Sequence, residues 1–278
     1  YSAVKVALAE LSPLALNALR FPLASLAVWA VLRAQGRVPL PRRADVAAVV
    51  ALGVLGNVVY QLLFIHGIDR TRAGNASLLF AGTPILTALI AAAAFRERLS
   101  RRAWAGVFAS VAGMALVVVG GGEAVGMGSE TLAGDLILLG ASVAWAAYSV
   151  GSQPLIERYG PVAVTAWTLW AGTPVLLVLG VPPLLAHDLA GLGGVVWGSI
   201  VFSGVLGIGI AYLIWYHGVR HIGSTRTATY SNLVPVLAVL VAWGWLGEVP
   251  TVWQAAGAAV IIGGVTLVRD DGRQGAAA

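Results

Sequence analysis

The chain has no cysteine and few charged residues, and each shortage excludes a class of protein. The absence of cysteine rules out disulfide bonds and thiolate metal sites. Only 10% of the residues are charged and 59% are hydrophobic, whereas an ordinary soluble domain carries about 25% charged residues. The core of a soluble domain cannot bury that much apolar surface, so the composition predicts a membrane protein.

The apolar residues fall into long runs, and none of the runs alternates between apolar and polar positions. Each run is close to the roughly 20 residues that cross a bilayer as a helix. A strand of a transmembrane barrel would alternate over about 10 residues, so the pattern favours helices. The predicted spans are residues 14–32, 45–68, 71–95, 102–119, 131–153, 161–181, 194–217, 227–246 and 252–268.

The chain also contains an internal sequence repeat, in which residues 53–117 align with residues 204–268 without a gap. Both copies begin with Gly-Val-Leu-Gly, and both continue with a Pro, a Glu and two Gly at identical spacing. Two related halves are typical of secondary transporters. The spaced residues are Pro84, Glu97, Gly106 and Gly113 in the first copy and Pro235, Glu248, Gly257 and Gly264 in the second.

The repeat divides the chain into two predicted halves, residues 1–119 and 131–268. Residues 120–130 form a short Gly-rich linker, so we expect one membrane unit, and residues 269–278 form a cytoplasmic tail. The start of the first half aligns with residues near 148, which leaves residues 131–147 without a counterpart. We therefore expect a segment of similar length ahead of Tyr1, and ten helices in the intact protein with the first one truncated here.

An odd number of spans in each half means that the two halves enter the membrane from opposite sides. The Arg-rich loops 33–45 and 96–102 are predicted to be cytoplasmic. The counterpart of the second loop, residues 247–251, has no basic residue, as expected for the opposite side. The basic residues are scattered between apolar spans instead of forming one stripe, so we expect no nucleic-acid partner.

These features resemble the drug/metabolite transporter (DMT) superfamily, in particular bacterial EamA-type exporters, whose halves each close with the Pro, Glu and paired Gly described above. Ala18-Leu19-Arg20-Phe21 and Trp145 add to the resemblance. The resemblance implies an all-α bundle of ten helices in two inverted five-helix repeats. It also implies a place in the bacterial inner membrane, both termini in the cytoplasm, and outward movement of small metabolites such as amino acids.

A transport path requires polar or aromatic side chains that face the interior of the bundle. Such residues recur on the third, sixth, eighth and ninth predicted helices, and we expect them to converge on a central cavity without fixed charge. Hydrogen bonding between helices is an equally good interpretation of Gln61, Tyr148, Tyr212 and Asn232. The candidate substrate-binding residues are Tyr60, Gln61, Trp145, Tyr148, Tyr212, Trp215, Tyr230 and Asn232.

Pro84 and Pro235 lie in the middle of predicted helices, where each removes a backbone hydrogen bond. They are either hinges or static kinks. Glu97 and Glu248 are interpreted as carboxylates that complement the start of the following helix, and His66 and His217 as interfacial residues. Lys5 and Arg20 are expected near the outer helix ends, from which they snorkel toward water, and Asp135 lies only a few residues into the sixth helix.

The sequence thus predicts a secondary transporter that exports aromatic or hydrophobic amino acids by alternating access, with the lipid bilayer and a small molecule as partners. Alternatives are a nucleotide-sugar or other metabolite carrier, or a non-transporting membrane scaffold. An enzyme would need paired carboxylates or a metal cluster at depth, so we expect no enzymatic activity, cofactor or metal. The repeated glycines are equally suited to packing within the chain and to a homodimer contact.

Overall fold

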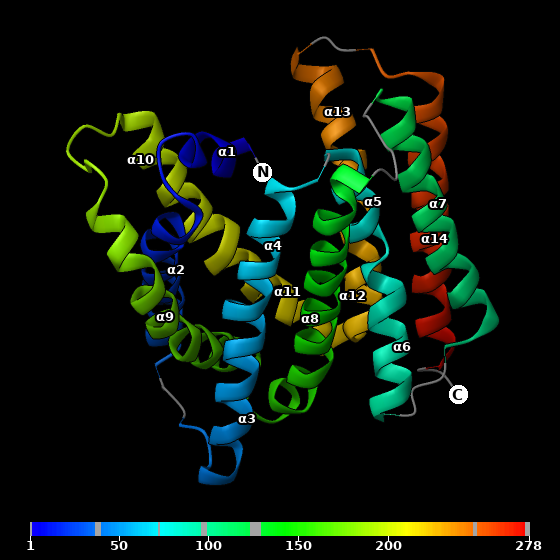
Figure 1. The fold of residues 1–278 in the computed structure, drawn as a ribbon. Coiled ribbons are helices and arrows are strands. Elements are labelled where there is room, and N and C mark those ends of the chain that lie inside the picture. The colour runs from blue at the N-terminus through cyan, green and yellow to red at the C-terminus, as the bar shows by residue number, and fades with distance from the viewer. Residues whose placement is uncertain are drawn as a thin grey trace. The chain divides into compact units, whose positions relative to one another are not determined.

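The computed structural model describes residues 2–36, 40–71, 73–95, 99–122, 129–246 and 249–275, and these residues form helices and no strand (Figure 1). Glu97 and Glu248 lie outside the described residues, as does the side chain of Lys5. The elements in chain order are α1 (Ser2–Leu8), α2 (Pro13–Ala34), α3 (Arg43–Val54), the π-helix η1 (Leu55–Val59), α4 (Tyr60–Asp69), α5 (Ala73–Ala81), α6 (Thr83–Phe95), α7 (Arg101–Gly120), α8 (Ser129–Tyr159), α9 (Pro161–Leu185), α10 (Gly194–Val201), the π-helix η2 (Phe202–Ile210), α11 (Ala211–Ile222), α12 (Ser224–Ser231), α13 (Val234–Leu246) and α14 (Val252–Gly275).

Eight helical segments within the described residues are long and apolar enough to cross a membrane. They confirm eight of the nine spans predicted from the sequence. The remaining span, residues 227–246, is divided between the shorter helices α12 and α13. An all-helical chain with this many apolar segments is an integral membrane protein, because a helix satisfies its own backbone hydrogen bonds in lipid.

Both repeated prolines lie at breaks between helices. Pro84 is the second residue of α6, and Pro235 is the second residue of α13. A proline in the first turn of a helix removes an N–H group that would have no partner there in any case. At the first break, the amide of Ile85 donates to the carbonyl of Gly82 at 3.0 Å. The carbonyl of Ala81, one residue earlier, is thereby left for another donor.

The chain forms two compact units, and each unit contains helices from both sequence halves. The first unit comprises Tyr1–Leu62 and Gly151–His221, and the second comprises Leu63–Val150 and Ile222–Ala278. The boundaries of the units therefore differ from those of the sequence repeats.

In the first unit, α2 packs along its counterpart in the second half, α9. A Cβ on Gly180 would lie 2.3 Å from the carbonyl oxygen of Leu14. Further along the same pair, the hydroxyls of Ser25 and Thr173 lie 2.9 Å apart. The contacts ascend along one helix and descend along the other, so α2 and α9 are antiparallel.

In the second unit, α7 and α14 run side by side (Figure 1) and approach most closely at the repeated glycines. A Cβ on Gly106 would lie 2.5 Å from the carbonyl oxygen of Gly264, and one on Gly113 would lie 2.7 Å from that of Gly257. The order of the contacts makes these helices antiparallel as well. Gly106 corresponds to Gly257 in the repeat and Gly113 to Gly264, so each contact is the counterpart of the other, as in a two-fold interface.

Candidate functional site

The eight candidate residues divide evenly between the two compact units. Tyr60, Gln61, Tyr212 and Trp215 belong to the first unit, whereas Trp145, Tyr148, Tyr230 and Asn232 belong to the second. The geometry of each group is therefore a property of its own unit.

In the first unit, Gln61 and Tyr212 form a buried pair. The amide nitrogen of Gln61 donates to the hydroxyl of Tyr212 at 3.3 Å, and the two residues are only 5% and 7% exposed. They are 151 residues apart, so they occupy the same position in the two halves. The contact is a hydrogen bond between two helices, which was the alternative to substrate binding in the interpretation of these residues. Tyr60 directly precedes Gln61, Trp215 lies one helical turn after Tyr212, and both are partly exposed.

A π-helix precedes each residue of this pair. The π-helix η1 ends directly before α4, which contains Gln61, and η2 ends directly before α11, which contains Tyr212. A π-helix inserts extra backbone into a helix and is frequent at functional sites. A glycine just before η1 and another within η2 allow close packing on neighbouring helices. A Cβ on Gly53 would lie 2.7 Å from the carbonyl oxygen of Thr168 in α9, and a Cβ on Gly204 would lie 2.8 Å from that of Arg20 in α2. Nothing in the apolar sequence predicted the π-helices.

Arg20 is not the snorkelling residue that we predicted, because its side chain is buried and only 6% exposed. One guanidinium nitrogen donates weakly to Asn17 Oδ1 at 3.5 Å, and Nε has no hydrogen-bond partner in the part of the chain that the structure describes. The phenol groups of Tyr60 and Tyr212 lie within electrostatic range of the guanidinium. The first unit therefore contains a buried charged side chain, which the sequence had placed at a helix end. The sequence does carry a sign of this buried charge, because Arg20 interrupts an otherwise apolar run.

In the second unit, Asn232 is 3% exposed and joins two other helices. Its amide nitrogen donates to the carbonyl oxygen of Ala81 at 3.3 Å and to the hydroxyl of Ser110 at 3.0 Å. Ala81 is the residue whose carbonyl is left over at the break before Pro84. These bonds match the helix-bridging interpretation of Asn232.

Three aromatic candidates complete the second group. The rings of Trp145 and Tyr148 are 5.5 Å apart between centroids and tilted by 54°. Tyr148 is fully buried, whereas Trp145 is partly exposed. Tyr230 packs beside an apolar cluster that includes Val236 and Ile261.

Asp135 is a partly buried carboxylate of the second unit, in the second turn of α8. It accepts a hydrogen bond from the hydroxyl of Thr71 and bonds of 3.0 and 3.2 Å from the amide of Asn75. This carboxylate therefore fastens the start of α8 to the start of α5.

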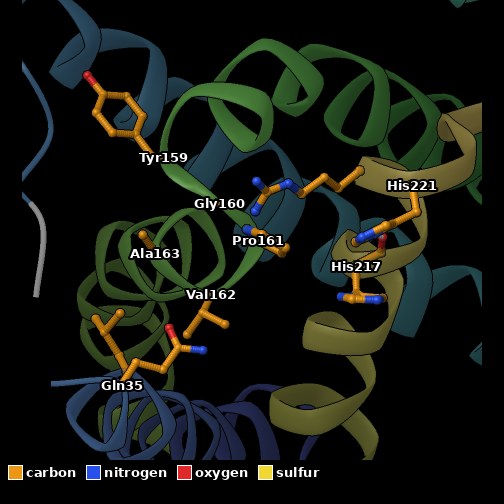
Figure 2. A pocket seen from close by; sticks show the side chains of 10 residues that line it. Gln35, Tyr159, Gly160, Pro161, Val162, Ala163, His217 and His221 are labelled. Carbon is orange, nitrogen blue, oxygen red and sulfur yellow. Dashed lines mark hydrogen bonds between the residues drawn. The ribbon is translucent and has the colours of Figure 1, made fainter. Parts of the chain in front are cut away.

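A cavity of about 650 Å³ lies in the first unit, at the ends of α2, α9 and α11 (Figure 2). The imidazole rings of His217 and His221 lie side by side on α11 with centroids 4.1 Å apart. His217 is exposed and His66 is partly exposed. No candidate substrate-binding residue lines this cavity, whose lining residues are Leu32, Gln35, Tyr159, Gly160, Pro161, Val162, Ala163, His217, Arg220 and His221.

Comparison with known proteins identifies relatives along the whole chain. The EamA-like transporter family matches residues 1–119 and 132–269. A protein of Streptantibioticus cattleyicolor named "Probable terminal-alkyne amino-acid exporter" is 31% identical over 268 residues, covering 96% of this chain and 88% of that protein. The uncharacterized transporter YyaM of Bacillus subtilis is 27% identical and covers 95% of this chain and 87% of that protein.

A solved crystal structure has the same fold. It matches this chain with a TM-score of 0.81 and 24% sequence identity, over 98% of this chain and 93% of the other. The helical architecture is therefore shared with an experimentally determined protein.

Proposed function

We propose that this chain, which belongs to the EamA-like transporter family, exports aromatic or hydrophobic amino acids across the bacterial inner membrane. The observation that carries the proposal is the polar and aromatic cluster around Gln61 and Tyr212, buried within otherwise apolar spans. Intramembrane polar residues of this kind mark substrate pathways. The similarity to a protein named as an amino-acid exporter supports the choice of cargo.

The transport cycle that we propose is alternating access by two inverted five-helix repeats in a ten-helix protein, with both termini in the cytoplasm. Support comes from the antiparallel packing of α2 with α9 and of α7 with α14, since each pair consists of equivalent helices from the two halves. Equivalent helices that run in opposite directions are what inverted repeats require. The breaks before Pro84 and Pro235 supply hinges.

In this proposal, the partly exposed rings of Tyr60 and Trp215 in the first unit contact the apolar part of the cargo. Within the second unit, the ring of Trp145 lies against that of Tyr148, and Asn232 holds the helix break in place. Aromatic contacts add about 0.5–1.5 kcal/mol to the burial of a ring.

Flux of labelled L-phenylalanine in proteoliposomes tests the proposal. We expect Trp215→Ala to raise KM by about tenfold, because the variant loses an aromatic contact of that strength. Trp243→Ala is the matched control, since Trp243 is 55% exposed on the surface of α13, and its KM should equal that of the wild type. Failure of the wild type to move any amino acid of a broad panel would refute the proposal. Flux of UDP-glucose in its place would identify a nucleotide-sugar carrier.

A further inference from the structure

Arg20 is a buried cation that the described part of the chain does not neutralise. A guanidinium keeps its charge at every physiological pH, and a buried charge is unfavourable unless it is paired and hydrogen-bonded. Among the side chains that the structure describes, Arg20 has no ion-pair partner, and its hydrogen bond to Asn17 is at the outer limit of length. A negatively charged ligand that binds beside Arg20 would neutralise this guanidinium.

Five carboxylate side chains are described, and each is engaged or exposed elsewhere. Asp45 accepts from Arg158 at 2.8 Å, Asp135 accepts from Thr71 and Asn75, and Glu157 accepts from Gln153. Asp188 accepts from the backbone of its own loop, and Glu10 is exposed. None of them is a partner for the guanidinium.

Asn17 adds a second unused donor next to Arg20. The two residues are one turn apart on α2, so their side chains lie on the same face. Asn17 is completely buried, and its Oδ1 is oriented toward Arg20 while its Nδ2 has no hydrogen-bond partner among the described residues. Arg20 Nε likewise has none. Two unused N–H donors and a fixed positive charge on one helix face are groups that bind a carboxylate.

We propose that Arg20 and Asn17 bind the carboxylate of the cargo, which makes carboxylic acids, and amino acids among them, the substrate class of this transporter. The inference rests on the proposed function and deepens it. Tyr60, whose phenol lies within electrostatic range of Arg20, is partly exposed, and in this proposal the apolar part of the cargo lies against the aromatic rings. Amines of the same shape that lack the carboxylate are excluded, because they would add a second positive charge beside Arg20.

The test compares L-phenylalanine with phenethylamine, its counterpart without the carboxylate, on the purified full chain. We expect L-phenylalanine to raise the midpoint of thermal unfolding and phenethylamine to leave it unchanged, since a ligand stabilises the state that it binds. In proteoliposomes, Arg20→Gln should raise the KM for L-phenylalanine by about tenfold or more. Arg20→Lys should give an intermediate value, because lysine keeps the charge and loses the paired donors.

The matched control is Arg43→Gln, which removes an exposed arginine from the start of α3 and should behave as the wild type. Without cargo, Arg20→Gln should melt at or above the wild type, because it removes an unpaired buried charge. The proposal is overturned if Arg20→Gln keeps the affinity for L-phenylalanine, if phenethylamine binds equally well, or if Arg20→Gln melts far below the wild type. A wild-type protein without any amino-acid flux would instead refute the proposed function.

Discussion

Replacing Gly264 with valine is expected to destabilise the protein by roughly 3 kcal/mol, the upper end of the range for overpacked sites. A Cβ at this position would lie 2.6 Å from the carbonyl oxygen of Gly106 and 2.7 Å from the amide nitrogen of Ser110. Both obstacles are backbone atoms of α7, so neither can rotate away as a side chain would. The two helices must therefore separate along the contact. Thermal unfolding in detergent measures the effect.

Gly263 provides a matched control on the neighbouring residue of the same helix. A Cβ at Gly263 meets nothing within 4 Å. Gly263→Ala should therefore be neutral or stabilising by about 0.4–1 kcal/mol, since alanine restricts the unfolded chain. Equal effects of the two substitutions would show that α7 and α14 do not approach as closely as described.

Asn232→Ala is expected to destabilise the second unit by about 1–3 kcal/mol, because it removes two buried hydrogen bonds between helices. The carbonyl of Ala81 would lose the amide that satisfies it at the break between α5 and α6. Ser110→Ala removes the other contact, the bond of 3.0 Å, and should have a smaller effect. The measurement is again the unfolding midpoint, with the loss of L-phenylalanine flux as a second readout.

Ser231→Ala is the control for that prediction. The hydroxyl of Ser231 donates to the carbonyl of Ala228 in its own helical turn and makes no bond to another helix that would be lost. Its replacement should change the free energy of unfolding by less than about 0.5 kcal/mol. If Asn232→Ala were as mild as Ser231→Ala, the bridge across the helix break would have no energetic role.

The helical membrane fold could be predicted because its signals are local or repeated. Long apolar runs indicate spans without knowledge of their neighbours, and the spacing of Gly106 and Gly113 recurs at Gly257 and Gly264. The partners of those glycines could not be predicted, since small residues suit contacts within a chain and between chains equally well. The structure pairs the first two with the second two inside the chain.

Arg20 shows what the sequence could not specify. The sequence shows where Arg20 lies along α2. However, α2 is apolar nearly all around, so its periodicity does not indicate which face packs against other helices. Burial of Arg20 depends on η2, a segment far along the chain that Gly204 brings against the backbone of α2. The same applies to Gln61 and Tyr212. Each was predicted as a candidate, whereas their contact with one another depends on the packing of the two halves.

Ser100 and Thr251 offer a direct comparison of the two halves, because they occupy equivalent positions and play the same local role. Ser100 Oγ accepts from the amide of Ala103 at 3.1 Å, and Thr251 Oγ1 accepts from the amide of Gln254 at 3.2 Å. Both residues are exposed at the start of a predicted span. The chain has no cysteine of its own, so Ser100→Cys and Thr251→Cys each introduce a single thiol with little change in size.

Labelling of these two variants in intact cells with a membrane-impermeant maleimide tests the inverted arrangement most directly. We expect that Thr251→Cys reacts from outside, whereas Ser100→Cys, within the Arg-rich loop 96–102, reacts only after the membrane is disrupted. Reaction of both thiols from the same side would mean that the two halves insert in parallel, and would contradict the inverted-repeat transporter.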